Sequence, residues 1–214
     1  MDKSKIANLR NNYMLNELLE NNVSQNPINQ FTEWFNDAIN AEMKEANAMV
    51  LSTVSDGKPK ARVVLLKGFD ENGFVFFTNY NSHKGAELEG NNFAALTFFW
   101  DVLERQVRVE GEISKLSEED SCEYFWSRPR ASQIGAWVSH QSETIVGRET
   151  LDEKLEFYNH KFESEDIVPK PPHWGGYVLK PESIEFWQGR PNRLHDRILY
   201  SLENENWRIE RLSP

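Results

Sequence analysis

The residues best suited to chemistry lie near the C-terminal end, where Arg193, His195 and Arg197 occupy every second position. They follow a stretch of glycine, proline and asparagine, so the pattern predicts a hairpin whose second strand starts at residue 193. Side chains of a strand alternate between its faces, which would place these three on one face, with Trp187 near them across the turn. Three nitrogen-rich side chains repel one another unless an anion or an electron-rich group lies between them. The alternative is a solvated polar face on an edge hairpin.

A second candidate anion site lies at the start of a predicted short helix. Ser82 can cap this helix, which is expected to begin near Lys84. A lysine in the first turn opposes the helix dipole, so Lys84 is poorly placed for helix stability. The same position suits a bound anion, because the dipole and the ammonium group then attract it together. This conflict favours a functional role for Lys84.

Two further basic residues, Arg62 and Lys67, bracket an apolar run. In one continuous strand over residues 62–69, their side chains would point to opposite faces. The strand could then serve two anions, or one of the two residues could be an ordinary surface charge. The chain has no G-x-G-x-x-G or P-loop motif, so a bound phosphate must depend more on side-chain charge than on a glycine-rich backbone.

Tyr124, Arg128 and Ser132 are spaced by four residues. On one continuous helix they would align on one side. Pro129 prevents a regular helix, so we expect the three side chains to converge around a bend instead. A phenol, a guanidinium and a hydroxyl group suit the oxygens of a phosphate. The alternative is a helix end with solvated polar groups.

Two polar positions are less informative. Gln106 lies in a strand pattern, and a buried glutamine needs hydrogen-bond partners, so a structural and a functional role are equally compatible with it. Cys122 lies in a predicted helix and fits a packed thiol better than a nucleophile. As the single cysteine, it cannot form an internal disulfide or a cysteine-based zinc site. No metal site is expected.

Composition narrows the class of protein. The 214 residues suffice for one domain with a hydrophobic core. The net charge of −10 argues against nucleic-acid binding by bulk electrostatics, and a local group of arginines in such an acidic chain suggests a small anionic ligand. No apolar run approaches a membrane span, and no signal-peptide pattern opens the chain. Together with the single cysteine, this favours a cytoplasmic protein.

The hydrophobic periodicity predicts an α+β fold that is mainly antiparallel β. Helices are expected from Pro27 onward and over residues 151–162. A capping box at Ser117 and Asp120 opens another helix, which ends before Pro129. Residues 1–25 are expected to form a mobile segment with a short helix over residues 13–19, and residues 26–214 a single domain. Strands with short antiparallel connections are expected over residues 49–54, 62–69, 74–79, 93–100, 105–116, 177–187, 193–202 and 207–212.

The C-terminal stretch also resembles a known family. Glu185-Phe186-Trp187-Gln188-Gly189, followed by Arg193-Leu194-His195-Asp196-Arg197, is similar to the C-terminal pattern of the pyridoxine (pyridoxamine) 5′-phosphate oxidases. The ordered set of blocks is far more specific than any one of them, and it covers nearly the whole chain after the first few residues. The other blocks are Arg62-Val63-Val64-Leu65-Leu66-Lys67, Phe77-Thr78-Asn79, Ser82-His83-Lys84-Gly85, Leu103-Glu104-Arg105-Gln106-Val107, Ser127-Arg128-Pro129-Arg130, Gln133-Ile134-Gly135-Ala136-Trp137 and His173-Trp174-Gly175-Gly176.

The resemblance implies a split β-barrel with flanking helices that binds FMN at a homodimer interface. It implies an oxidase that converts pyridoxamine 5′-phosphate or pyridoxine 5′-phosphate to pyridoxal 5′-phosphate, with O2 reduced to hydrogen peroxide. In such an enzyme the flavin carries the redox chemistry, and the protein supplies orientation and charge. The alternatives are a split-barrel protein that binds flavin or pyridoxal phosphate without turnover, and another FMN oxidoreductase on the same fold.

The resemblance also implies roles for individual residues. Arg193 and His195 would be catalytic, and His195 could hydrogen-bond the reacting amine or alcohol and assist its deprotonation. His83 departs from the family, which usually has Arg at this position. The substrate contacts implied are Lys67, Tyr124, Arg128, Ser132, Arg193, Leu194 and His195, with Arg10 and Tyr13 from a segment that closes over the substrate. The FMN contacts implied are Arg62, Val63, Val64, Leu65, Leu66, Lys67, Phe77, Thr78, His83, Lys84, Gln106, Trp187 and Arg197, with Gln141 and Ser142 contributed by the partner subunit.

Overall fold

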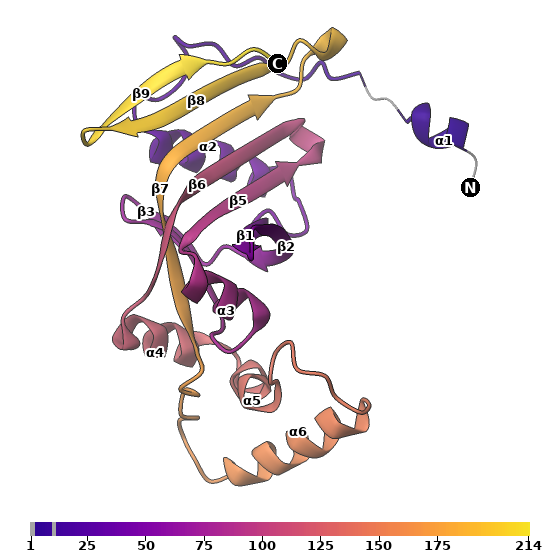
Figure 1. The fold of residues 1–214 in the computed structure, drawn as a ribbon, viewed down its shortest axis with the longest axis vertical. Coiled ribbons are helices and arrows are strands. Elements are labelled where there is room, and N and C mark those ends of the chain that lie inside the picture. The colour runs from indigo at the N-terminus through magenta and orange to yellow at the C-terminus, as the bar shows by residue number, and fades with distance from the viewer. Residues whose placement is uncertain (1–2, 10–11) are drawn as a thin grey trace. The chain divides into compact units, whose positions relative to one another are not determined.

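The computed structural model describes residues 3–9 and 12–214, and this part of the chain combines antiparallel strands with short helices (Figure 1). No helix in these residues is long and apolar enough to cross a membrane. The helices are α1 Lys3–Ala7, α2 Pro27–Asn40, α3 His83–Gly90, α4 Glu118–Ser127, α5 Arg130–Val138 and α6 Glu149–Lys161. The strands are β1 Ala48–Ser55, β2 Lys58–Leu65, β3 Gly68–Asp70, β4 Gly73–Asn79, β5 Phe93–Trp100, β6 Arg105–Lys115, β7 Trp174–Gln188, β8 Asp196–Glu203 and β9 Asn206–Arg211, with the 3₁₀ turns η1 Asp101–Leu103 and η2 Pro191–Arg193.

The chain forms two compact units. The first consists of Met1–Met49, Leu96–Glu110 and Pro181–Pro214, and the second of Val50–Ala95 and Gly111–Lys180. Strands β1, β5, β6 and β7 each continue from one unit into the other. The strand order is β2-β1-β5-β6-β7-β4-β3, and β8 pairs with β7 and β9. A single domain over residues 26–214 therefore stays a prediction.

In the second unit, helices α4, α5 and α6 pack around a separate hydrophobic core. Strand β4 pairs antiparallel with the first half of β7, so that Phe77 lies opposite Gly176. Helix α4 is capped by Ser117, whose Oγ accepts the Asp120 N–H, as the capping pattern predicts. It ends at Ser127, before Pro129, and α5 begins directly after this proline. The core residues are Phe125, Ile134, Ala136, Val138, Phe162, Val168 and Trp174, with α6 packed against α5.

In the first unit, helix α2 supplies the core. Asn26 caps it by accepting the Ile28 N–H at 2.7 Å, and Pro27 occupies its first turn, where a missing N–H costs nothing. Phe31 and Trp34 lie on its buried face, and both pack edge to face, on Phe98 and on Phe186 respectively. The apolar helical face predicted from Pro27 onward is thus confirmed.

Two predicted strands have different limits in the structure. The apolar run from residue 62 to residue 69 is not one strand: β2 ends at Leu65, and β3, which pairs with β4, begins at Gly68. Periodicity does not show such a change of partner. Strand β8 begins at Asp196 and not at residue 193, because Asn192 and Arg193 have φ values of 58° and 62°. This left-handed backbone does not continue into an extended strand.

The helix expected over residues 13–19 is wrong. This segment has no helical backbone, because its N–H groups have partners on distant elements. Those of Met14 and Leu15 donate to the Glu104 carboxylate, and that of Leu18 donates to Asp196. Side-chain acceptors therefore replace the i−4 carbonyls that a helix would require.

Candidate functional site

A cavity of about 700 Å³ in the second unit brings together most of the residues singled out from the sequence. Strands β2 and β4, the start of α3 and the junction between α4 and α5 contribute its walls. The predicted site residues that line it are Arg62, Val63, Val64, Leu65, Lys67, Phe77, Thr78, Lys84, Tyr124, Arg128, Ser132 and Gln141. Asn79, Pro129, Gly135, Ala136, Ser139 and Trp174 complete the lining.

At one place in this cavity the Lys84 ammonium is buried among neutral groups. Helix α3 is capped by Ser82, as predicted, and Lys84 lies in its first turn. The Lys84 Nζ donates to Gln141 Oε1 at 2.5 Å, and lies 3.3 Å from Thr78 Oγ1 and 3.4 Å from Ser82 Oγ. Among the described residues no carboxylate lies within 4.0 Å of this nitrogen. Burial, with a further contribution from nearby Arg62, lowers the pKa of Lys84.

Arg62 has the anionic partner that Lys84 lacks. Its guanidinium contacts Glu87 Oε2 at 2.6 Å and Thr53 Oγ1 at 2.5 Å, and the Thr53 hydroxyl donates to the same carboxylate. These bonds to Thr53 and Arg62 outweigh the effect of burial and lower the pKa of Glu87. Arg62 and Lys67 line the same cavity, so the expectation that they serve opposite faces is wrong. Lys67 lies beyond the end of β2, where strand alternation no longer applies.

The α4–α5 junction places Tyr124, Arg128 and Ser132 around the same cavity, as the bend at Pro129 predicts. The side chain of Gln133 holds the junction by donating to the backbone oxygen of Arg128 at 2.8 Å. The Arg128 guanidinium lies 4.6 Å from the centre of the Trp174 ring, a cation–π distance. Its Nη1 is buried without a hydrogen-bond partner in the described chain, and burial lowers its pKa.

Parallel aromatic rings form one wall beside these groups. Phe77 stacks on Tyr124 with ring centres 3.9 Å apart, and Trp174 lies 5.3 Å from Phe77 at an interplanar angle of 12°. Only a glycine fits at position 176, because a Cβ there would lie 2.8 Å from the Phe77 ring. A flat apolar wall next to unpaired cations suits a ligand with a planar ring and an anionic group.

The predicted cofactor contacts that do not line this cavity are Leu66, His83, Gln106, Ser142, Trp187 and Arg197. Leu66 is buried, and Gln106 is half-buried on β6 in the first unit. His83 is exposed at the start of α3, and its backbone N–H donates to Ser142 Oγ at 3.2 Å. Ser142 itself has a left-handed backbone with φ of 76°.

A second group of predicted residues lies in the first unit. Tyr13, Arg193 and His195 line a cavity of about 650 Å³ together with Leu9, Asn12, Arg190 and Asn192. The His195 ring lies 4.6 Å from the Trp187 ring and 5.9 Å from the Tyr13 ring. Leu194 is 69% exposed, and Arg10 lies outside the described residues.

The hydrogen bonds of His195 restrict its protonation. Its Nδ1 accepts the backbone N–H of Arg190 at 3.1 Å, so the neutral ring carries its proton on Nε2. Burial lowers the pKa of His195, and the positive charge of Arg193 makes a smaller contribution in the same direction. The ring is therefore suited to donate a hydrogen bond from Nε2 and not to accept a proton there.

Arg197 does not line the cavity that contains His195. It lies on β8 opposite Trp187, and its guanidinium forms an ion pair with Glu185 of β7 at 2.8 Å. Glu185 also contacts Arg108 at 3.2 Å. The hydrogen bonds that Arg197 donates to the Glu185 carboxylate raise the pKa of Arg197. The missing carboxylate thus comes from the neighbouring strand, which the residues next to Arg197 in sequence do not indicate.

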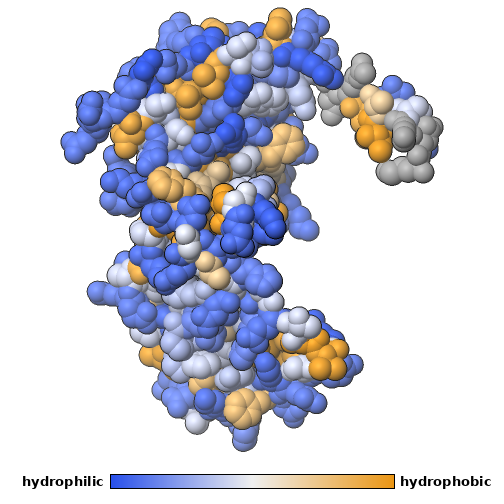
Figure 2. Space-filling model, viewed as in Figure 1, coloured by the Kyte–Doolittle hydropathy of each residue, from blue (hydrophilic) through white to orange (hydrophobic). Residues whose placement is uncertain are grey.

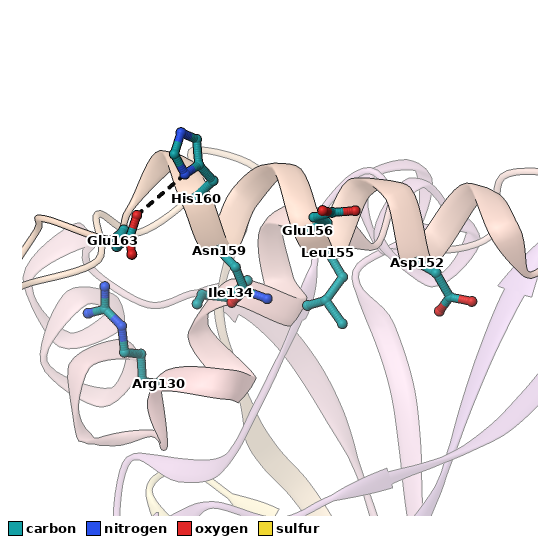
Figure 3. Close-up of a pocket in the computed structure, with 8 residues that line it drawn as sticks. All are labelled: Arg130, Ile134, Asp152, Leu155, Glu156, Asn159, His160 and Glu163. Atoms are coloured by element: carbon teal, nitrogen blue, oxygen red, sulfur yellow. Dashed lines mark ion pairs between the residues drawn. The ribbon is translucent and has the colours of Figure 1, made fainter.

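A groove of about 710 Å³ lies between α5 and α6 in the second unit. Figure 3 shows three carboxylates among its lining side chains, Asp152 and Glu156 on α6 and Glu163 just beyond it. His160 is paired to Glu163 at 3.4 Å. The Arg130 guanidinium already has partners, because it donates to the backbone oxygens of Phe162 and Glu165 just after α6. None of the catalytic, substrate or cofactor contacts predicted from the sequence lines this groove.

Comparison with known proteins identifies relatives along the whole chain. Residues 35–157 match the family described as pyridoxamine 5′-phosphate oxidase, and residues 174–214 match the pyridoxine 5′-phosphate oxidase C-terminal dimerisation region. A curated pyridoxine/pyridoxamine 5′-phosphate oxidase of Gloeothece citriformis is 57% identical over 216 residues, with 100% of both chains covered. One of Cytophaga hutchinsonii is 51% identical and covers 99% of this chain and 100% of its own.

Solved structures show the same fold. PhzG from Burkholderia lata, in complex with tetrahydrophenazine-1-carboxylic acid, is 28% identical and superposes with a TM-score of 0.86 over 94% of this chain and 99% of its own. An FMN-binding protein of Nostoc punctiforme, related to pyridoxamine 5′-phosphate oxidase, has a TM-score of 0.70 at 17% identity and covers 90% of this chain and 100% of its own. The predicted α+β, mainly antiparallel split-barrel fold is confirmed.

Proposed function

Because the chain belongs to the pyridoxine/pyridoxamine 5′-phosphate oxidase family, we propose that it oxidises pyridoxamine 5′-phosphate or pyridoxine 5′-phosphate to pyridoxal 5′-phosphate, with FMN as cofactor and O2 as acceptor. The amine reaction consumes O2 and water and yields the aldehyde, ammonia and hydrogen peroxide. The alcohol reaction consumes O2 and yields the aldehyde and hydrogen peroxide. The observation that carries this proposal is one cavity with two buried cationic groups, Lys84 and Arg128, that lack an anionic partner.

Lys84 and the start of α3 fit the phosphate of FMN. The free N–H groups and dipole of a helix N-terminus attract an anion, and Lys84 adds a full charge at the same place. Thr78, Ser82 and Gln141 now satisfy the ammonium as neutral acceptors. When bound, FMN supplies the group that accepts a hydride from C4′ of the substrate.

Arg128, Tyr124 and Ser132 fit the phosphate of the substrate, with Lys67 at the same cavity. The Nη1 of Arg128 is a buried hydrogen-bond donor without an acceptor in the described chain, and a phosphate oxygen would be a strong acceptor for it. The phenol and the hydroxyl offer further hydrogen bonds. This arrangement favours a phosphorylated substrate over its unphosphorylated form.

Arg193 and His195 act, by family resemblance, on the reacting end of the substrate. The bond from the Arg190 N–H to Nδ1 leaves His195 with a donor at Nε2. We assign His195 the orientation of the amine or alcohol through this donor, and not the removal of its proton. Arg193 lines the cavity of His195 and contributes a positive charge there.

A homodimer is part of the same proposal. Residues 174–214 match a dimerisation region, and FMN contacts would then come from both subunits. Figure 2 shows apolar side chains among the polar ones on the surface. Val63, Phe93 and Phe99 are 67%, 50% and 56% exposed, and a homodimer interface would bury apolar side chains of this kind.

An aerobic assay of the FMN-loaded protein tests the proposal. Aldehyde and peroxide should form in equal amounts from pyridoxamine 5′-phosphate, and much more slowly from pyridoxamine. A protein that binds FMN but forms neither product would instead be a flavin-binding protein without turnover. Equal rates with the phosphorylated and unphosphorylated amines would contradict the assignment of the Arg128 cluster to the substrate phosphate.

A further inference from the structure

Residues 12–20, here called the N-terminal strap, form part of the cavity that contains His195. Tyr13 lines this cavity together with Arg193 and His195. The Tyr13 ring packs edge to face on Trp187 at 5.8 Å, and lies 5.9 Å from the ring of His195. The strap has no helical backbone that would fix the position of Tyr13, so its place must be set by contacts with other elements.

Gly189 provides the space for the Tyr13 ring. A Cβ at position 189 would lie 2.7 Å from Tyr13 Cγ and 2.8 Å from Tyr13 Cβ, closer than real Cβ contacts. The backbone N–H of Gly189 donates to the backbone oxygen of Glu104 at 2.7 Å. The turn that holds the tyrosine ring is therefore tied directly to Glu104.

Glu104 also binds the backbone that follows Tyr13. Its Oε2 accepts the N–H of Met14 at 2.9 Å and the N–H of Leu15 at 3.1 Å. The backbone of Glu104 is left-handed, with φ of 53°. Glycine or asparagine adopts this conformation more readily than glutamate, so the needs of the turn do not explain the residue. The carboxylate that accepts two strap N–H groups does explain it.

A second carboxylate holds the far part of the strap. Asp196 accepts the Leu18 N–H at 3.1 Å and forms an ion pair with Arg211 at 2.7 Å. Arg211 in turn donates to the Leu18 carbonyl oxygen and to both oxygens of Glu20. These contacts lie four residues or more beyond Tyr13, so they fix the strap without fixing the ring. Glu104 is the carboxylate next to the ring itself.

We propose that Glu104 is a positioning residue, which holds Tyr13 in the His195 cavity by binding the two backbone N–H groups that follow it. This inference rests on the proposed oxidase function for its kinetic consequence, but not for its structural one. Tyr13 makes contact at the reacting end of the substrate, and Glu104 acts through Tyr13. Loss of the Glu104 carboxylate frees the strap over residues 12–15, because Arg190 still holds the Asn16 carbonyl oxygen at 3.0 Å, and removes the tyrosine wall from the cavity.

The experiment combines amide exchange with a double-mutant cycle in the FMN-loaded protein. Glu104→Ala should speed hydrogen exchange of a peptide covering residues 12–20 by about tenfold, the effect expected when hydrogen bonds to a charged acceptor are lost. Glu104→Gln keeps an oxygen acceptor and should retain most of the protection. Asp101→Ala removes an exposed carboxylate three residues away on the same connection and serves as the matched control.

Kinetics test whether Glu104 acts through Tyr13. Glu104→Ala should raise KM for pyridoxamine 5′-phosphate by about tenfold with FMN affinity unchanged, as expected for loss of charged hydrogen bonds. Added to Tyr13→Ala, the same change should have no further effect. Unchanged exchange in residues 12–20, or an equal KM effect with and without Tyr13, would overturn the proposal. A wild-type protein without turnover would defeat the proposed function alone, and the exchange measurement would still decide the role of Glu104.

Discussion

We expect Arg128 to lower the stability of the ligand-free protein and to bind the phosphate of the substrate. The substitution Arg128→Met allows these two effects to be measured separately. Methionine keeps an apolar side chain over Trp174 but removes the buried Nη1 that has no hydrogen-bond partner in the described chain. An unsatisfied buried donor costs about 1–3 kcal/mol. The lost cation–π contact contributes about 0.5–2 kcal/mol. The free energy of unfolding should therefore change by between about −1 and +2.5 kcal/mol, with its centre on the stabilising side, which is unusual for the loss of a half-buried side chain.

The kinetic effect of the same change should be large and of opposite sign. A charged hydrogen bond contributes about 1.5–3 kcal/mol, so kcat/KM for pyridoxamine 5′-phosphate should fall roughly 10- to 150-fold. The value for unphosphorylated pyridoxamine, and the affinity for FMN, should not change. Urea unfolding of the FMN-free protein and aldehyde formation by the loaded protein measure both quantities, with Arg148→Met as a surface control. A variant that is clearly less stable and retains its preference for the phosphorylated amine would refute the reasoning and make Arg128 a structural residue.

Three further predictions concern the other charged groups. Lys84→Met should weaken FMN binding by roughly 10- to 150-fold. Burial lowers the pKa of Lys84 from its ordinary value of 10.5, so just below that pH the unfolded chain binds more protons than the folded protein. The free energy of unfolding of wild type, relative to that of Lys84→Met, should therefore rise between pH 8 and 10 in urea unfolding without FMN. A difference that stays constant over this range would contradict the prediction. His195→Gln, which keeps a donor near the Nε2 position, should retain far more flavin reduction in anaerobic stopped flow than His195→Leu; equal losses would return His195 to the role of a base. His83→Arg should bind FMN more tightly than wild type, because arginine can donate two parallel hydrogen bonds to a phosphate; equal dissociation constants would show that His83 does not touch the phosphate.

The parts of the site that follow from local sequence could be predicted. Ser82 and Ser117 cap their helices because a cap is defined by residues three positions apart. Pro129 ends α4, and this bend brings Tyr124 and Arg128 to one cavity. Each of these inferences uses a backbone rule that acts over a few residues, and the chain around them does not override it.

The parts that failed depend on partners far along the chain. Glu87 pairs with Arg62 across 25 residues, and Glu104 binds the Met14 N–H across 90 residues. Neither distance leaves a periodic trace in the sequence. The strand predicted to start at residue 193 failed for another reason, because two left-handed residues extend the turn and delay the strand to Asp196. The asparagine at position 192 was a weak indication of this longer turn, because asparagine tolerates a left-handed backbone.

The strongest argument for the proposed phosphate site is that only some buried basic residues of this chain have a carboxylate partner, and the residues at the site do not. The chain has 34 acidic and 24 basic residues, so anionic partners are abundant. Lys170, with only 2% of its side chain exposed, has a carboxylate at 3.1 Å, and buried Arg105 has one at 2.7 Å. Lys84 and Arg128 have none within 4.0 Å in the described residues, although burial of an unpaired charge costs several kcal/mol. Because both line one cavity, the simplest cause is a ligand set with two anionic groups, and the phosphates of FMN and of a phosphorylated substrate meet that requirement.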